Sequence, residues 1–418
     1  MFEKSKIFSK ILFVPMMLIA FGVIGYLLLA GVYCLPTERM EKNMRESIDI
    51  FYEEDNYPQL MEYKNSQLDN YTDGIMLLTA SNPNNENIWH AAINAERYRT
   101  SDTPVQTILD VYGDGVEDSN STYYARYWHG YLLFLKPLLM VFGYGQIREI
   151  MMFAQLGLFA ILLVMLAKRN IKLTIPVFLM WIFLNPVSTM LSLQFNTVLT
   201  ITFIAMLAIL CANEKKAIKN MYTWGIFFMT IGVLTSYFDL LTYPLLTLGA
   251  PLALWMVFNL SENFRSNLQN IVLLSFFWGI GYGGMWVLKW IIGDLITGEN
   301  VIGDAVEQVA YRTSSVVEET FVTISHLVHE LQYSARQYTW ILALLLLVIY
   351  FIYRVIKMRK LNLNMLISYF MISVFPVAWY LAMKNHSFGH HWFTYRELAI
   401  SIYALSTCML IHGEERNG

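Results

Sequence analysis

The chain has little charge, little cysteine and no basic excess. Charged residues make up 15% of its 418 residues and hydrophobic residues make up 56%, whereas a soluble domain carries about 25% charge. A net charge of -3 offers no positive excess for nucleic acid, so we expect no nucleic-acid partner. The three cysteines, Cys34, Cys211 and Cys408, include no CxxC pair, so we expect no disulfide framework and no thiol chemistry. We find no internal repeat, which weighs against an inverted-repeat transporter.

Apolar runs close to the length that crosses a bilayer recur along the whole chain. They predict an all-α polytopic integral membrane protein with about ten transmembrane helices in a single domain, residues 1–418. The first span is expected at residues 11–35 and the remaining spans at 147–411. Between them, residues 36–146 form a long first outer loop with amphipathic interface helices, because Met40, Met44, Ile48 and Phe51 recur at helical spacing. Residues 293–337 and 384–396 are expected to form two further outer loops.

The positive charges predict how the chain is oriented. Every short loop that the alternation of spans places inside contains Lys or Arg, and the long polar loops all fall outside. Both termini are therefore expected to be cytoplasmic, with no soluble domain after the last span. We expect a multi-pass protein of the bacterial plasma membrane, and any active site should face outside, where most ionisable groups other than plain Lys and Arg gather.

Two acids, Asp69 and Asp73, stand directly before the apolar run 75–78 in the first outer loop. If that run is a helix at the membrane surface, both carboxylates lie on one face at the water–lipid boundary. A carboxylate in a partly dry setting has a raised pKa and becomes a better base toward a hydroxyl group. The competing interpretation is a solvated helix start, with Asp as its cap. We favour Asp69 slightly, because Asp73 precedes Gly74 and is the better candidate for the helix-start acid.

Histidine and arginine concentrate in residues 384–396, which contain the segment NHSFGHHWFTYR. Arginine offers a fixed fork of donors to phosphate oxygens, and histidine can donate there too. We therefore take His386, His390 and Arg396 as candidates for phosphate or substrate binding. A metal site including His391, or an ordered interface loop without chemistry, are the alternatives.

Other outer-side residues are weaker candidates for the same donor-phosphate or substrate contacts: Arg312, Lys289, Asp239, Arg126 and His129. The default interpretation of Lys289 is a lysine that extends from an aromatic-rich span end to water. Asp239 lies in a tight turn between two spans, where a charge is costly unless it is used or paired.

In layout, the chain resembles the GT-C superfamily of glycosyltransferases, polytopic enzymes that use polyprenyl-phosphate sugars. Residues 67–80, QLDNYTDGIMLLTA, and the segment NHSFGHHWFTYR are similar to stretches of bacterial cell-envelope sugar transferases. The resemblance implies a catalytic Asp at Asp69 or Asp73. These acids lie farther from the first span than is usual in the family, which keeps residues 53–55 (Glu-Glu-Asp) open as an alternative. Without a C-terminal outer domain, the loops would have to bind the acceptor.

The resemblance further implies an inverting transfer of a monosaccharide to a cell-envelope glycan or a lipid-linked acceptor. The Asp would take the proton of the acceptor hydroxyl, and Arg396, His386, His390 and Arg312 would stabilise the leaving lipid phosphate. The expected partners are the polyprenyl-phosphate-linked sugar donor, the acceptor and membrane lipids. We name no metal ligand and no cofactor, although a divalent cation stays open as a candidate.

Three other functions compete with this one. A transporter or flippase of a lipid-linked saccharide would place ionisable groups along a mid-membrane path, whereas these crowd at the outer ends. An O-antigen-ligase-like enzyme usually has its large outer loop late in the chain, whereas the long loop here is early; a membrane acyltransferase is a related alternative. A non-catalytic membrane partner is the third.

Overall fold

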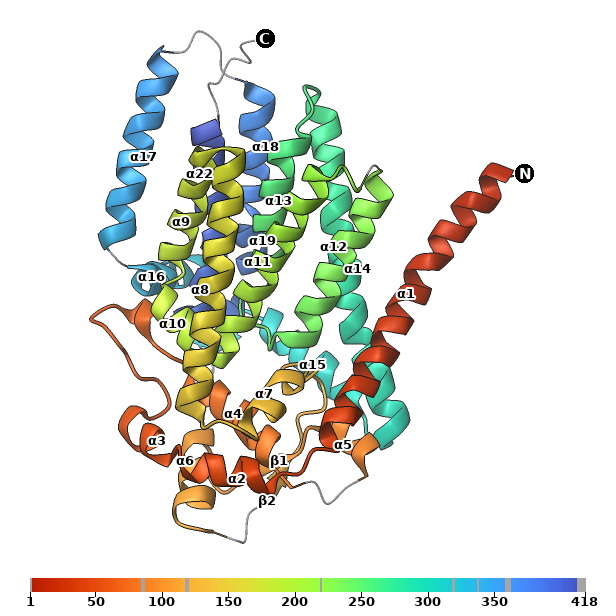
Figure 1. Ribbon diagram of the computed structural model, residues 1–418, viewed down its shortest axis with the longest axis vertical. Coiled ribbons are helices and arrows are strands. Elements are labelled where there is room, and N and C mark those ends of the chain that lie inside the picture. Colours follow the sequence, from red (N-terminus) through yellow and green to blue (C-terminus); the bar gives the residue numbers. More distant parts are fainter. Residues whose placement is uncertain are drawn as a thin grey trace.

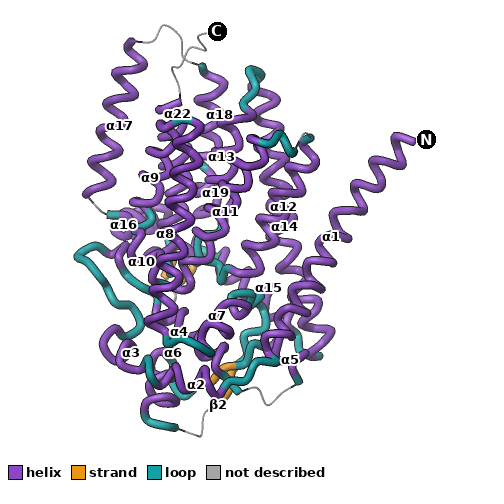
Figure 2. Tube along the Cα trace, in the orientation of Figure 1, coloured by secondary structure: helices purple, strands orange, loops and turns teal. Residues whose placement is uncertain are grey.

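The computed structural model describes residues 2–83, 87–116, 120–218, 220–317, 320–336, 338–357 and 362–411. Long helices run side by side through most of the molecule, and short helices and loops gather at one end, the lower end of Figure 1. Figure 2 shows how little of the described chain is strand.

The helices, in chain order, are α1 (Phe2–Tyr33), α2 (Glu38–Arg45), α3 (Ile48–Glu54), α4 (Asn70–Ser81), α5 (Ile88–Asn94), α6 (Pro104–Ile108), α7 (Leu132–Leu139), α8 (Tyr144–Arg169), α9 (Thr174–Phe183), α10 (Pro186–Leu191), α11 (Leu193–Glu214), α12 (Met221–Phe238), α13 (Leu246–Asn259), α14 (Phe264–Thr297), α15 (Val301–Thr313), α16 (Ile324–Ala335), α17 (Tyr338–Lys357), α18 (Leu363–Ser373), α19 (Phe375–Ala382), α20 (Lys384–Gly389), α21 (His391–Thr394) and α22 (Ala399–Ile411). Short 3-10 turns cover Lys64–Ser66, Ile171–Leu173 and Tyr395–Leu398, and a π turn covers Leu109–Gly113. Two small antiparallel ribbons pair β1 (Arg97–Arg99) with β2 (Asn120–Thr122) and β3 (Val316–Val317) with β4 (Thr320–Phe321).

Six helical segments of the described chain are long and apolar enough to cross a membrane. They are Leu12–Tyr33, Tyr144–Arg169, Leu193–Glu214, Met221–Phe238, Phe264–Thr297 and Leu363–Ala382. The chain is therefore a mainly α-helical, multi-pass membrane protein. Within the part of the chain where the remaining spans are predicted, the apolar stretch 173–191 was expected to form one span, but it is divided in the structure. The helix α9 ends at Phe183, and Asn185, with a φ of 53°, caps the start of α10.

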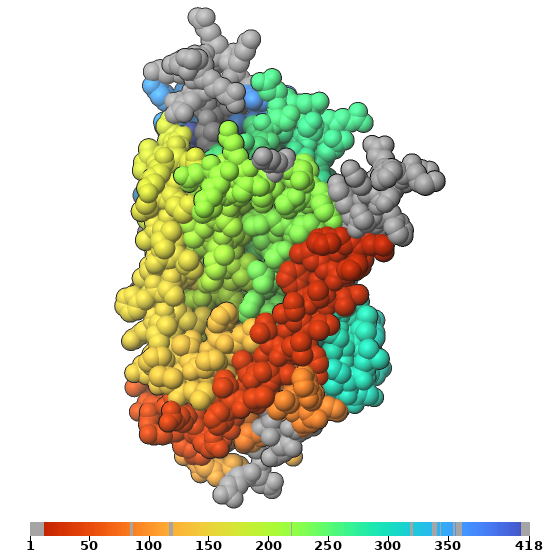
Figure 3. Space-filling view, turned by 45° about the vertical axis from the view of Figure 1, so that its right-hand side comes forward, coloured from red at the N-terminus to blue at the C-terminus, as the bar shows by residue number. Residues whose placement is uncertain are grey.

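Two glycines allow α12 and α14 to pack closely. A Cβ atom at Gly232 would lie 2.2 Å from the Trp278 carbonyl oxygen, and one at Gly281 would lie 2.0 Å from the Met229 carbonyl oxygen. Small residues at a helix contact let two backbones approach in this way, which is a common basis of helix association in membranes. The neighbouring α1 instead lies across the outside of the bundle with much of its surface exposed, as Figure 3 shows in red.

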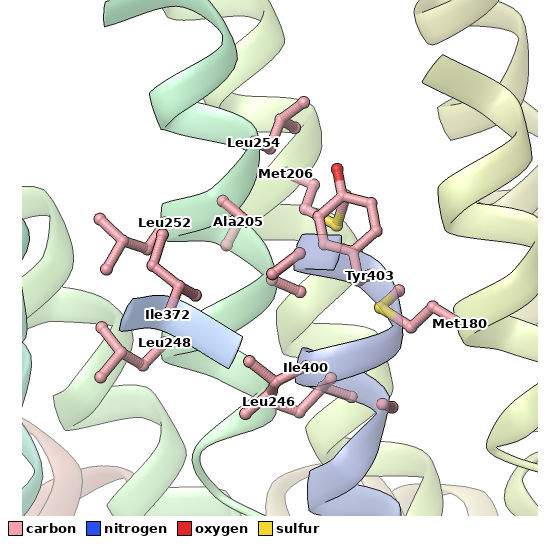
Figure 4. Packing of buried hydrophobic residues seen from close by; sticks show 14 of the residues in the cluster. Met180, Ala205, Met206, Leu246, Leu248, Leu252, Leu254, Ile372, Ile400 and Tyr403 are labelled. Atoms are coloured by element: carbon pink, nitrogen blue, oxygen red, sulfur yellow. The ribbon is translucent and has the colours of Figure 1, made fainter. Parts of the chain in front are cut away.

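The largest apolar core lies among α9, α11, α13, α18 and α22. Figure 4 shows side chains from these five helices in contact, among them Met180, Met206, Leu252, Ile372 and Tyr403. The second core joins the short helices of the first outer loop to α1, α12 and α14. This second core positions α4, which is the centre of the candidate site.

The helix α4 differs from its expected place at the membrane surface. Residues 73–81 are all buried inside the protein, because α2, α6, α7 and α11 surround them. Its carbonyl end receives a hydrogen bond of 2.7 Å from the buried Lys136 ammonium to the Ala80 oxygen, and a cation at a helix C-terminus is favoured by the helix dipole. The amphipathic segment before it does form helices, α2 and α3, and it buries Met40, Met44 and Phe51 against the same core.

Candidate active site

Asp69 caps the N-terminus of α4. Its carboxylate accepts hydrogen bonds from the Thr72 backbone N–H (3.0 Å) and from the Thr72 hydroxyl (3.1 Å), one on each oxygen. A carboxylate can accept about four, so half of its capacity is unused by the described residues. Only 1% of Asp69 is exposed, and burial raises its pKa to about 7, against an ordinary value of 3.8. Asp69 itself, rather than Asp73, is thus the acid that starts the helix.

Asp73, one turn later, is fully occupied. Its carboxylate accepts from the Tyr144 hydroxyl (2.8 Å), the Leu193 and Gln194 backbone N–H groups (2.9 and 3.0 Å) and the Ser192 hydroxyl (3.2 Å). Three of these donors belong to the start of α11, whose N-terminal N–H groups would otherwise lack partners. Burial raises the Asp73 pKa, while Arg148 and the hydrogen bonds act to lower it. Asp73 therefore joins α4 to the start of α11.

The competing cluster at residues 53–55 is divided between two structural tasks. Glu54 forms a two-pronged ion pair with Arg148, with both N–O distances 2.9 Å, and it accepts a further bond from Asn70. Asp55, at a φ of 55°, accepts from the backbone and side-chain N–H groups of Asn56. Glu54 therefore fixes α3 against α4 and α8.

Arg396 is a fully buried cation close enough to Asp69 to lower the pKa of that carboxyl. Its guanidinium donates to the Ser188 hydroxyl (2.8 Å), the Trp392 carbonyl (3.1 Å) and the Leu184 carbonyl (3.2 Å), and lies 4.1 Å from the centre of the Phe195 ring. Within the described chain, no carboxylate lies within ion-pair distance of it. A buried arginine held by neutral groups keeps a net positive charge that a ligand anion can neutralise.

His386 fixes the position of Arg312. Its Nε2 is 2.9 Å from the Leu241 carbonyl, and a carbonyl only accepts, so Nε2 carries the proton. Nδ1 must then accept from Arg312, whose guanidinium nitrogen is 2.8 Å away. Burial lowers the His386 pKa well below its ordinary range, so the ring is neutral. The neutral His386 ring thus holds the Arg312 guanidinium in place, although the two residues are 74 positions apart in the chain.

His390 and Trp392 complete a chain of contacts from Arg396 to Arg312. The His390 ring lies 4.9 Å from that of His386 and 5.3 Å from that of Trp392, and the Trp392 carbonyl accepts from Arg396. The His390 Nδ1 and the Trp392 ring N–H are buried without a hydrogen-bond partner among the described residues. Burial lowers the His390 pKa to about 4. Such buried groups are able to bond to water or to a ligand.

Aromatic rings lie near Asp69, beyond the Trp392 end of this chain of contacts. Burial, and then the nearby Asp69 carboxylate, raise the pKa of Tyr57 above its ordinary range. Its ring stacks on Tyr71 at 5.9 Å and meets the edge of Trp392 at 5.4 Å. Such rings offer flat apolar faces, with polar edges, beside a reactive carboxylate.

An apolar groove of about 340 Å³ lies between α14, α15 and α19, and Arg312 is among the residues that line it. Its lining is rich in aromatic side chains, and we call it the aromatic groove: Tyr127, Tyr282, Trp286, Trp290 and Trp379, with Arg126 and Arg312 as its cations. An apolar groove with a fixed arginine in its lining suits a hydrocarbon chain with a phosphate head.

Three other predicted site residues, Arg126, His129 and Lys289, form ion pairs or hydrogen bonds within the protein. Arg126 pairs with both oxygens of Asp304 (2.9 and 3.2 Å), although it still lines the aromatic groove. His129 donates from Nε2 to the Tyr124 carbonyl (2.8 Å), contacts the Tyr131 hydroxyl (2.9 Å), and has its pKa lowered to about 3 by burial. Lys289 does not extend to water: it is fully buried and donates to the Ile93 carbonyl at the end of α5 (2.7 Å).

Asp239 closes the turn between α12 and α13. It accepts from the backbone N–H and the hydroxyl of Thr242, and burial raises its pKa to about 7. The turn then presents the Leu241 carbonyl, with φ at 65°, to His386. Asp239 therefore positions His386 through the loop.

Sequence reasoning missed Glu397 and Arg148. Glu397 is fully buried; one oxygen accepts from the Leu245 backbone N–H (3.2 Å) and the other has no partner in the described chain. Burial and the nearby Asp239 raise its pKa well above the ordinary range. The sequence signal for Glu397 was its position directly before the apolar run 398–411. The signal for Arg148 was a charged residue just inside the region of predicted spans, which begins at residue 147.

The His, Cys, Asp and Glu residues of the described chain include no group of three placed to hold a metal ion. His391 instead contacts the Ser334 hydroxyl at 2.6 Å and Glu330 at 3.6 Å.

No protein-family model matches the chain, and neither the curated proteins nor the solved structures include a match to it.

Proposed function

We propose that the protein is a membrane glycosyltransferase. It moves a monosaccharide from a polyprenyl-phosphate sugar to a glycan or lipid-linked acceptor of the cell envelope, with inversion at the anomeric carbon. Asp69 is the general base, and Arg396, His390, His386 and Arg312 surround the phosphate.

In this reaction the Asp69 carboxylate removes the proton of an acceptor hydroxyl as its oxygen bonds to the anomeric carbon. The bond from that carbon to the phosphate oxygen breaks on the opposite face, and the polyprenyl phosphate leaves with the electron pair. Arginine donors stabilise its increasing negative charge. A base near neutral pKa is close to the optimum for a hydroxyl nucleophile at physiological pH.

One observation carries the proposal: a buried carboxylate with half of its acceptor capacity unused lies near a buried arginine that has no carboxylate partner among the described residues. A carboxylate and an arginine with only structural tasks would be expected to pair directly. A substrate that brings both a proton and a negative charge would satisfy both groups.

The number of membrane spans and the orientation of the chain are part of the same proposal. Four shorter apolar helices, Ile171–Phe183, Leu246–Asn259, Leu344–Tyr353 and α22, would bring six long candidates to the expected total of about ten spans. Both termini would then be cytoplasmic, and the end of the molecule that contains α2 to α7 in Figure 1 would face outside, across a bacterial plasma membrane.

The test is transfer of a labelled sugar by purified protein in lipid vesicles. Polyprenyl-phosphate sugars are supplied with candidate acceptors on the side of the α2–α7 end. Product with inverted anomeric configuration, formed by wild type and lost in Asp69→Asn, is the expected result. Movement of the intact donor across the bilayer without transfer would support the flippase alternative and end the proposal.

A further inference from the structure

The ribbon of β1 and β2 contacts α4, at the end of the protein that contains α2 to α7 (Figure 1). Successive residues of a strand point to opposite faces. Tyr98, the middle residue of β1, packs against the second core, so Arg97 and Arg99 lie on the other face. Their antiparallel partners on β2 are Thr122 and Asn120, which share that face. One face of the ribbon is therefore polar and carries two arginines.

Arg97 is a partly buried cation without a counter-ion. No residue of the described chain forms a hydrogen bond or an ion pair with its guanidinium, and its Nε is buried. Burial lowers the Arg97 pKa, while the nearby Tyr124 and Tyr71 raise it. The acid directly before the strand, Glu96, lies by alternation on the opposite face, with Tyr98. A cation taken partly out of water in this way is stabilised by an anion that comes from outside the chain.

Tyr71 lies between Arg97 and the proposed base. It is the second residue of α4 and directly precedes Thr72, which donates both hydrogen bonds to Asp69. Its ring stacks on that of Tyr57 at 5.9 Å, on the side of Asp69, and its hydroxyl acts on the charge of Arg97. A saccharide lying across Tyr71 would therefore have the carboxylate on one side and the free guanidinium on the other.

A polar pocket of about 470 Å³ continues along the ribbon from Arg97. Residues 99–102 and 120–122 line it, and all of them have polar side chains. Hydroxyl, amide and charged groups match the hydroxyl groups of a saccharide, whereas a hydrocarbon chain would leave them without partners. Arg99 is paired there with the exposed Asp102 (3.4 Å), so Arg97 is the arginine of this face that is left for an anion.

We propose that Arg97 binds an acidic group of the acceptor saccharide, a carboxylate or a phosphate ester, while a hydroxyl of the same saccharide lies at Asp69. Arginine binds either group through two parallel N–H···O bonds. The inference rests on the proposed function and gives its acceptor a chemical class, an anionic glycan whose further sugars lie in the polar pocket. The donor phosphate has cations of its own, Arg396 and Arg312.

The experiment titrates one trisaccharide, in three forms, against purified protein in lipid vesicles without donor. The forms end in a uronic acid, in the neutral sugar obtained by reducing that carboxyl, and in the same neutral sugar phosphorylated on its primary hydroxyl. Wild type is expected to bind at least one charged form about tenfold more tightly than the neutral form, and that form identifies the acidic group. Equal binding of all three forms, or no binding, would overturn the inference.

Two substitutions that each remove one positive charge show whether Arg97 is responsible. Arg97→Gln should bind the charged forms no better than the neutral one. Arg169→Gln is the matched control, because Arg169 is also partly exposed but pairs with Glu214 (3.3 Å) at the far end of α8, and it should keep the preference. Equal losses in the two variants would overturn the inference. If Arg97→Gln does not fold, Arg97→Lys decides, since lysine keeps the charge but not the fork; an unchanged preference there would contradict the proposal.

Transfer kinetics separate the acceptor from the donor. With the charged acceptor, Arg97→Gln should raise the acceptor KM about tenfold and leave the donor KM within about twofold of wild type. A higher donor KM with an unchanged acceptor KM would assign Arg97 to the donor and overturn the inference, with the transferase activity left in place. If wild type transfers sugar to none of the three forms or to any other acceptor, the proposed function fails. The titration then still decides whether Arg97 binds an anionic saccharide.

Discussion

Two buried carboxylates begin the same helix four residues apart, and they differ in the number of donors that reach them. Asp73 accepts four hydrogen bonds from Tyr144 and the start of α11, whereas Asp69 accepts two, both from Thr72. Buried polar groups are normally satisfied. The four hydrogen bonds that Asp73 accepts therefore indicate a structural role. Asp69 can still accept further hydrogen bonds, so it is the carboxylate able to receive a substrate.

The two buried arginines nearby show the same contrast. Arg148 forms a two-pronged pair with Glu54, whereas the Arg396 guanidinium is held by carbonyl and hydroxyl oxygens and aromatic rings. The charge of an ion-paired cation is already neutralised, whereas a cation without a carboxylate partner can neutralise an anionic ligand. Substitution can separate Asp73 and the ion-paired Arg148 from Asp69 and Arg396, which has no carboxylate partner in the described chain.

The largest expected effect is on catalysis. Asp69→Asn should lower the transfer rate by about 10²- to 10⁴-fold, the usual contribution of a general base. Asn caps helices as well as Asp does, so the fold should be retained. The rate is measured in vesicles and the fold by thermal unfolding in detergent. Wild-type transfer by the variant would refute Asp69 as the base.

Asp73→Asn should affect stability instead. The amide presents a donor to the N–H groups of Leu193 and Gln194, so the variant should lose about 1–3 kcal/mol of stability from unsatisfied donors at the start of α11. A lowered Tm is expected, with near-normal transfer per folded molecule. Asp69→Asn is the matched control, and an unchanged Tm in Asp73→Asn would remove its structural assignment.

The rate should depend on the ionisation of Asp69. Its pKa of about 7 means that the base is increasingly protonated below pH 7, so the rate should fall about tenfold per pH unit there and level off above it. Because the pKa is raised on folding from 3.8, this group stabilises the fold at low pH and loses that contribution as pH rises to 7. Initial rates from pH 5 to 9 test this, and a profile that is flat between pH 5.5 and 7 contradicts it.

The smallest expected effect comes from His386→Ala, which frees the Arg312 guanidinium. Arg312 keeps its charge and loses one positioning hydrogen bond, for which about 1 kcal/mol is typical, so the KM for the donor should rise by about five- to tenfold, with a smaller change in kcat. His129→Ala removes an equally buried, neutral histidine outside the chain of contacts and should leave the donor KM unchanged. Equal changes in donor KM would mean that His386 has no special part in positioning Arg312.

Much of the helical layout follows from residue pattern. The apolar run after Asp69 predicts a helix, and α4 occupies Asn70–Ser81. The amphipathic segment before it predicts the helices α2 and α3. Periodicity cannot show that α4 is covered on all sides, because the covering residues come from distant segments such as α7 and α11.

The pattern also could not distinguish Asp69 from Asp73. The groups that donate hydrogen bonds to Asp73 lie 71 to 121 residues away along the chain. The position of Gly74 favoured Asp73 as the acid that starts the helix, which is wrong, because Asp69 caps it. Lys289 and His129 looked like site residues because they are ionisable and lie near span ends. Their partners are backbone carbonyls, which have no signature in a sequence.

The most direct test of the central claim is the ratio of transfer rates of Asp69→Asn and Asp73→Asn, each per folded molecule and in the same vesicle preparation. A ratio below about 1:100, with Asp73→Asn close to wild type, is the predicted result. Equal rates, or a slower Asp73→Asn enzyme, would contradict the assignment of catalysis to the unsaturated carboxylate.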